Sequence, residues 1–161
     1  MTPDRFRGAL LGLAVGDALG TTLEFVPPWS VRPLTDLVGG GPFGLMPGQW
    51  TDDTSMALCL AESVVGRGFD PMHQLELYVR WYRHGHLSST GGCFDIGNTT
   101  RAALHEFERQ PRPFPGWTTH DAAGNGSLMR LAPVLLRWAF DPARAVELAG
   151  ESSRTDRKSV V

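Results

Sequence analysis

The chain has 161 residues, of which 42% are hydrophobic and 20% are charged, and these proportions fit one water-soluble domain with a single core. Its formal net charge of −2 at pH 7 gives no electrostatic basis for binding nucleic acid or an anionic membrane, so neither is expected as a partner. Two cysteines are too few for a disulfide framework, which predicts a reduced, cytoplasmic protein.

The first predicted element is a helix over residues 3–19. Residues 8–16 form an apolar segment behind two arginines, which is also the pattern of a secretory signal peptide. The segment is shorter than the roughly 20 apolar residues that span a bilayer, and Asp17 interrupts it. We therefore interpret it as a core helix of the folded domain.

Four glycines are spaced four residues apart along this helix and share one face: Gly8, Gly12, Gly16 and Gly20. A glycine inside a helix costs about 1 kcal/mol relative to alanine. Close approach of a neighbouring helix or a ligand would compensate for this cost. The spacing therefore predicts that the helix is central and buried.

Residues 21–49 follow as a long loop rich in proline and glycine, and loops of this length are usually functional or disordered. Five further helices are predicted between glycine or proline boundaries, over residues 53–65, 71–83, 96–109, 127–138 and 142–151. No segment shows the alternation typical of a strand. The sequence therefore predicts an all-α fold.

A hydroxyl and two carboxylates stand side by side at Thr51, Asp52 and Asp53, where the second helix is expected to begin. Oxygen ligands suit Mg²⁺, Mn²⁺ or Ca²⁺ better than zinc. The free N–H groups of a helix start also stabilise negative charge, which favours ionised acids ready to bind metal. The alternative is that one aspartate simply caps the helix.

Three further segments carry polar groups suited to a site. Glu24 follows the glycine-containing helix, although an isolated acid in a loop is commonly a solvated surface residue. Asp95 precedes a predicted helix and could be only its cap. The glycine-rich segment 124–130 leads into another helix, and its backbone N–H groups could bind phosphate.

Taken in order, five segments of the chain resemble the ADP-ribosylglycohydrolase family, in particular its dinitrogenase-reductase-activating branch. The matching stretches are residues 8–20, 24–25, 48–54, 94–99 and 124–130, within a resemblance over about residues 5–155. It implies an all-α hydrolase that removes ADP-ribose from a modified protein side chain, with an arginine N-glycosidic bond favoured, or from a small-molecule conjugate. It also implies two Mg²⁺ ions, with Mn²⁺ possible.

The resemblance assigns roles to individual residues. Metal binding falls to Thr51, Asp52, Asp53 and Glu24. Catalysis falls to Asp95, on the ribose side of the substrate, and to Glu24. Substrate binding falls to the loop residues Gly124, Asn125, Gly126, Ser127 and Met129. Two cations held in this way could orient the ribose hydroxyls and activate a water molecule.

The sequence departs from the family pattern at its C-terminus. Family members continue further and carry a second ligand cluster of the type Gly-Asp-x-Asp-Thr, which this sequence lacks. Residues 156–161 match what a common sequencing adapter would encode before a stop codon. We therefore expect an incomplete, C-terminally truncated domain over residues 1–155, a non-native tail over residues 156–161, and an inactive fragment that is a monomer.

Two other functions stay open at this point. The chain could be a non-catalytic ADP-ribose-binding or crystallin-like structural protein, although clustered acids that repel one another have no purpose in a purely structural protein. A small helical interaction module would explain the helices but neither the acidic cluster nor the glycine-rich loop. The acids and the loop therefore favour the hydrolase.

Overall fold

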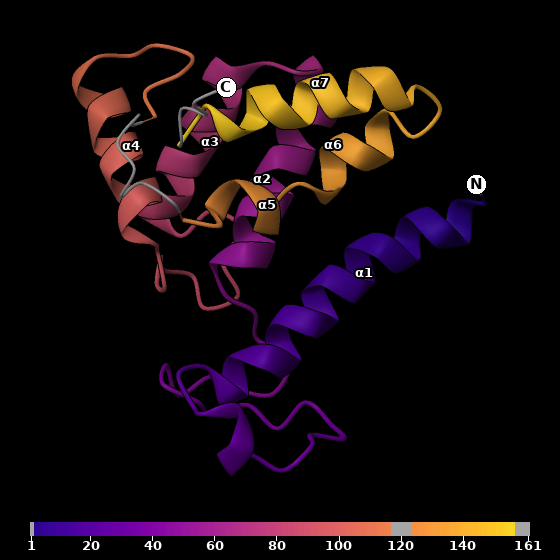
Figure 1. The fold of residues 1–161 in the computed structure, drawn as a ribbon. Coiled ribbons are helices and arrows are strands. Elements are labelled where there is room, and N and C mark those ends of the chain that lie inside the picture. The colour runs from indigo at the N-terminus through magenta and orange to yellow at the C-terminus, as the bar shows by residue number, and fades with distance from the viewer. Residues whose placement is uncertain (1, 117–123, 157–161) are drawn as a thin grey trace.

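The computed structural model describes residues 2–116 and 124–156 (Figure 1). The described residues form α-helices and two 3-10 helices with no strand, which confirms the all-α prediction. The helices are α1 (Pro3–Gly20), η1 (Thr21–Leu23), η2 (Pro28–Ser30), α2 (Asp52–Arg67), α3 (Pro71–His84), α4 (Asn98–Arg109), α5 (Gly126–Met129), α6 (Ala132–Arg137) and α7 (Pro142–Ser153). None of these helices is long and apolar enough to cross a membrane.

Helix α2 lies at the centre of the helical body and contacts α1, α3, α5 and α6 (Figure 1). Its buried apolar side chains recur every three or four residues, which places one continuous face of the helix against its neighbours. The core cluster consists of Met56, Cys59, Leu60, Val64, Leu75, Leu77, Tyr78, Trp81, Leu104, Phe107, Val134 and Leu148. This core holds the start of α2, and with it the predicted ligands, in a fixed place.

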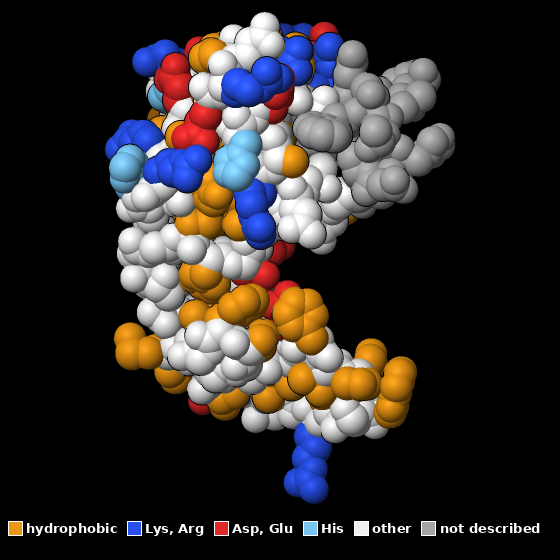
Figure 2. Space-filling model, turned by 90° about the vertical axis from the view of Figure 1, so that its left-hand side faces the viewer, with side chains coloured by type: hydrophobic (Ala, Val, Ile, Leu, Met, Phe, Trp, Pro, Cys, Tyr) orange, Lys and Arg blue, Asp and Glu red, His pale blue; other side chains and the backbone are white. Residues whose placement is uncertain are grey.

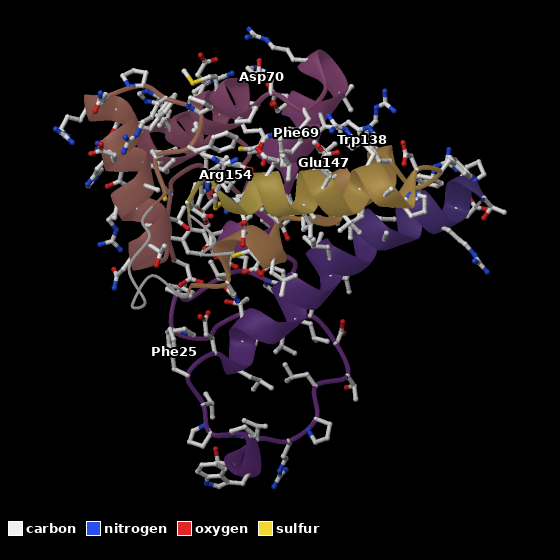
Figure 3. All side chains as sticks on the ribbon, turned by 45° about the horizontal axis from the view of Figure 1, so that its top comes forward. Phe25, Phe69, Asp70, Trp138, Glu147 and Arg154 are labelled. Carbon is white, nitrogen blue, oxygen red and sulfur yellow. The ribbon has the colours of Figure 1, made fainter. Side chains whose placement is uncertain are left out.

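Local sequence signals set the ends of α3. The carboxylate of Asp70 accepts hydrogen bonds from the backbone N–H groups of Met72 and His73 at 3.0 and 3.2 Å, and Pro71 occupies the first turn. The helix ends at Gly85, whose φ of 65° is the left-handed conformation that glycine adopts without strain. Just outside α3, the ring of Phe69 packs edge-on against Trp138, beyond the end of α6, at 6.3 Å between centroids (Figure 3).

The expectation that the glycine-containing helix is buried is wrong. Among the described residues of α1 only Ala18 is buried, and Leu11 on this helix is 64% exposed. A Cβ atom built at Gly8, Gly12, Gly16 or Gly20 would meet no other atom within 4 Å. The glycine spacing indicated a close neighbour, but no described residue packs against this face.

The single helix predicted over residues 127–138 is also wrong, because two short helices, α5 and α6, replace it. They are separated at Arg130 and Leu131. Pro133 has no N–H group to donate to the carbonyl of Met129, so a continuous helix cannot form here. At this break the side chain of Arg130 points into the core, where it is fully buried.

The described fold extends to Asp156, the first residue of the predicted non-native tail. Asp156 is only 4% exposed, and its carboxylate bonds to Arg130. The origin of the tail stays a prediction, and residues 157–161 lie outside the described part of the chain.

Candidate active site

An open cavity of about 410 Å³ lies where the C-terminal half of α1 meets the start of α2. Its lining residues are Gly12, Leu13, Gly16, Asp17, Gly20, Thr21, Glu24, Thr51, Asp53 and Asp95. The exposed glycine face of α1 thus forms one wall of this cavity. Figure 2 shows acidic side chains at the inner end of a concave region of the surface. We call this cavity the acidic pocket.

The acidic pocket brings together four residues that the sequence assigned to the site. Glu24 comes from the loop after η1, Thr51 and Asp53 from the start of α2, and Asp95 from the loop before α4. No lysine, arginine or histidine is among the residues that line it. The pocket therefore concentrates negative charge without a basic partner on its walls.

Asp52 does not line the acidic pocket, although its carboxyl group is within hydrogen-bonding distance of that of Asp53. It lines a second, smaller cavity of about 70 Å³ with Gly97, Asn98, Thr99, Thr100, Gly124, Asn125, Gly126 and Met129. Four of the five residues predicted to bind substrate are therefore beside Asp52, whereas Ser127 does not line this cavity. We call it the loop pocket. The structure thus divides the predicted site into two neighbouring cavities on either side of the start of α2.

Asp17 is a residue of the site to which the sequence analysis assigned no function. Its carboxylate accepts hydrogen bonds from the backbone N–H and the hydroxyl of Thr51, the hydroxyl lying 2.8 Å from Oδ1. It also accepts from the backbone N–H and the hydroxyl of Thr54, at 3.1 and 2.6 Å from Oδ2. The signal in the sequence was the charge of Asp17 itself, which interrupts an otherwise apolar helix.

Two residues of the pocket region have unusual backbone conformations. Asp95 has a φ of 55° and Phe25, next to Glu24, has a φ of 61°. Residues other than glycine adopt this left-handed region rarely, and such strain persists only where the surrounding structure imposes it. These conformations accompany the approach of the carboxyl groups of Glu24 and Asp95 to hydrogen-bonding distance. Phe25 itself is exposed on the loop (Figure 3).

The carboxyl groups of the two pockets raise one another's pKa. Burial, followed by the negative charges of Asp53 and Asp95, raises the pKa of Asp52 to about 8. Burial, followed by the charge of Glu24, raises the pKa of Asp95 to about 6. Burial and the charges of Asp53 and Asp17 also raise the pKa of Glu24. A bound cation would relieve this repulsion.

The donors present suit a hard cation, because carboxylate and hydroxyl oxygens are the ligands that Mg²⁺ and Mn²⁺ prefer. Among the described residues, however, no three His, Cys, Asp or Glu side chains are grouped closely enough to hold an ion by themselves. Mg²⁺ usually keeps several waters and uses only one or two carboxylates from the protein. An ion here would therefore complete its coordination with Thr51 Oγ1, water or substrate.

A sequence model of the ADP-ribosylglycohydrolase family matches residues 1–160 of the chain. The chain belongs to the ADP-ribosylglycohydrolase family. It is 56% identical over 131 residues to ADP-ribosylarginine hydrolase Tri1 of Serratia proteamaculans, a match that covers 81% of this chain and 36% of that protein. It is 36% identical over 145 residues to the ADP-ribosyl-[dinitrogen reductase] glycohydrolase of Rhodospirillum rubrum, covering 87% and 47%.

A solved structure of an ADP-ribosylglycohydrolase-related protein complex has the same fold. It superposes on this family member with a TM-score of 0.81 at 45% sequence identity, covering 96% of this chain and 49% of that one. The chain thus spans between about a third and a half of the relatives that it matches. The family and fold are established by these matches.

Proposed function

We propose that the chain is part of a Mg²⁺-dependent hydrolase that removes ADP-ribose from a modified protein side chain, with the N-glycosidic bond of ADP-ribosyl-arginine favoured. One observation carries the proposal: Glu24, Thr51, Asp53 and Asp95 come from separate segments and line one acidic pocket. The name of the Serratia relative supports arginine as the acceptor. Other ADP-ribose conjugates are the alternative substrates.

The residues of the acidic pocket would hold metal and handle a proton. Thr51 and Asp53 supply oxygen donors, with Glu24 near them, and a bound Mg²⁺ would polarise the ribose oxygens and activate water. Asp95 has a raised pKa of about 6, so near neutral pH it exchanges a proton readily. In this role it gives a proton to the leaving group or takes one from water.

The glycine-rich loop would contact the diphosphate of the substrate from outside, since the loop pocket that it lines, at about 70 Å³, is too small to contain a nucleotide. Gly124, Asn125 and Gly126 present backbone groups around it, and backbone N–H groups of such loops bind phosphate oxygens. Asp52, at its edge, is buried and has a pKa of about 8, so in its protonated form it can donate a hydrogen bond to the substrate. In that protonated form Asp52 contacts the substrate and is not a metal ligand.

Because the chain spans about a third of the Serratia relative's length, we propose that these 161 residues bind ADP-ribose weakly and do not turn over alone. Joining them to the remaining part of that relative, beyond the region of the match, gives a test protein. We expect this chimera to release ADP-ribose from ADP-ribosyl-arginine with Mg²⁺ and not with EDTA.

Variants of the chimera locate the chemistry. Asp53→Ala is expected to lower the rate about a hundredfold or more, since a metal ion contributes several kcal/mol to such a reaction. Asp4→Ala is the matched control, because Asp4 is an exposed acid on α1 outside both pockets. Release of ADP-ribose that is equally fast in EDTA, or an Asp53→Ala variant as active as Asp4→Ala, would contradict the proposal.

A second candidate is a non-catalytic ADP-ribose-binding or crystallin-like protein of the same family. It is favoured by the lack of a preformed group of three metal donors among the described side chains. Calorimetry with ADP-ribose separates the two. Tight binding that does not depend on Mg²⁺, in a chimera with no turnover, supports this second candidate.

A further inference from the structure

The side chain of Asp17 connects two parts of the site that are 34 residues apart in the chain. It lies on α1, and its carboxylate reaches the first turn of α2. The residue that begins α2 as its cap, Thr51, makes no capping hydrogen bond with its own side chain. Asp17 instead accepts from the free N–H groups there, those of Thr51 and Thr54. The cap of α2 is therefore supplied by another helix.

The same carboxylate determines where the proton of the Thr51 hydroxyl lies. Thr51 Oγ1 is 2.8 Å from Asp17 Oδ1 and 3.5 Å from Asp53 Oδ2. A hydroxyl has one proton and two lone pairs, and the shorter bond takes the proton. Donation to Asp17 leaves the lone pairs of Oγ1 free on the acidic pocket, which Thr51 lines. A hydroxyl oxygen with its proton turned away is a suitable ligand for a hard cation.

Asp17 itself is poorly placed to be a ligand, although it also lines the acidic pocket. Its Oδ1 accepts the hydroxyl of Thr51, and its Oδ2 accepts the hydroxyl and the backbone N–H of Thr54. Oxygens that already accept these hydrogen bonds have less electron density left for a cation. Asp17 therefore orients the hydroxyl of Thr51, whereas Asp53, Glu24 and Asp95 are the carboxylates that would face the ion.

We propose that Asp17 is the positioning residue of the cation site, and that it acts through Thr51 by holding the hydroxyl proton away from the ion. The inference rests on the proposed function, because it presumes a cation in the acidic pocket. Groups that orient a metal ligand in this way typically change metal affinity about 10- to 100-fold when they are removed.

The test is a Mn²⁺ titration of the 161-residue chain, followed by electron paramagnetic resonance into the millimolar range. The variants are Asp17→Asn, Thr51→Val and the double variant. We expect each single variant to bind Mn²⁺ about tenfold or more weakly than the native chain. If Asp17 acts through Thr51, the double variant is no weaker than the weaker single variant, because both changes remove the same interaction.

Two further variants separate positioning from stability. Thr54→Val removes the other hydroxyl bond to Asp17, at 2.6 Å, and keeps the shape of the side chain. We expect it to lower the melting temperature while Mn²⁺ affinity stays within about threefold of native. Thr51→Ser keeps a hydroxyl at the same position and is expected to restore Mn²⁺ affinity to within the same limit.

The outcomes distinguish the inference from the function on which it rests. A native chain that retains no Mn²⁺ contradicts the metal site itself, and with it the inference. If the native chain binds Mn²⁺ but the losses from Asp17→Asn and Thr51→Val add together, Asp17 acts only as a distant charge and the inference alone fails. The inference also fails if Thr54→Val weakens Mn²⁺ binding as much as Asp17→Asn does.

Discussion

The buried ion pair between Arg130 and Asp156 gives the sharpest stability prediction. Arg130 is fully buried, its guanidinium lies over the ring of Tyr78 at 5.0 Å, and Asp156 is 4% exposed. Nη1 of Arg130 donates to Oδ2 of Asp156 at 2.7 Å, and Nη2 donates to Oδ1 at 3.0 Å. Two parallel bonds of this kind form a strong pairing between arginine and a carboxylate.

Replacing Asp156 by alanine would leave the guanidinium charged and buried. Breaking a buried pair by removing one partner destabilises a protein by about 3–5 kcal/mol. Folded domains have a total unfolding free energy of only about 5–15 kcal/mol, so the loss is a large share of it. Urea unfolding followed by circular dichroism measures the difference between native and Asp156→Ala chains.

The exposed pair Arg144–Glu147 supplies a matched control. Its atoms are 2.6 Å apart, as close as those of the buried pair, but both side chains are largely in solvent. Glu147→Ala is therefore expected to cost less than about 1 kcal/mol. If Asp156→Ala does not fold, Asp156→Asn, which keeps the shape and one acceptor, gives an intermediate loss. Equal losses in Asp156→Ala and Glu147→Ala would refute the reasoning that burial determines the strength of the pair.

Three other changes test separate features. A Cβ atom at Gly126 would lie 2.7 Å from Oδ2 of Asp156, so Gly126→Ala is expected to lower the unfolding free energy by about 1–3 kcal/mol in the same urea assay. Without metal, the pKa values of Asp95 and Asp52 are raised to about 6 and about 8. The contribution of these two groups to stability is therefore full below about pH 4 and is lost as pH rises through 6 to 8; thermal melts in EDTA between pH 6 and 8 should show this loss, and added Mg²⁺ should reduce it. On the open face of α1, Leu11→Glu should change the unfolding free energy by no more than about 0.5 kcal/mol, and a larger loss would mean that the face is covered.

Most helices could be predicted because their signals are local. The apolar spacing within α2 and the cap and stop residues of α3, Asp70 and Gly85, are set by neighbours within one or two turns. The sequence therefore predicted these elements to within a few residues. The same reasoning failed for α5 and α6, where the effect of Pro133 on the preceding turn outweighed the apolar pattern.

The burial of α1 could not be predicted because it depends on a neighbour that the pattern does not identify. Gly8, Gly12 and Gly16 indicate a surface suited to close approach, but a glycine spacing does not say which segment approaches. In the described residues the face is open, and Gly12 and Gly16 border the acidic pocket instead. The glycine spacing correctly indicated a helix surface that another group can approach closely, but the prediction that this surface is buried was wrong.

The sequence was enough to name the candidate residues of the site, but not to predict which cavity each side chain lines. Successive residues of a helix point about 100° apart, since each turn has 3.6 residues. Asp52 and Asp53 are therefore directed into different cavities, with Asp52 beside the glycine-rich loop and Asp53 in the acidic pocket. The two carboxyl groups stay within hydrogen-bonding distance of each other, yet each lines a different cavity, which the motif of adjacent acids alone does not indicate.

The contact of Asp17 on α1 with the start of α2 could not be predicted from the sequence, because it joins residues 34 positions apart. Asp17 accepts the free donors at the start of α2, so its negative charge is offset by partial positive charge from the helix end. No basic side chain lines the pocket beside Glu24, Asp53 and Asp95. Burial, followed by the negative charges of neighbouring carboxylates, raises the pKa of each of the three. A cation entering the acidic pocket is therefore attracted most strongly to the side formed by these three residues. Asp17 then faces it only through the hydroxyl of Thr51, which is the arrangement that the Mn²⁺ titration examines.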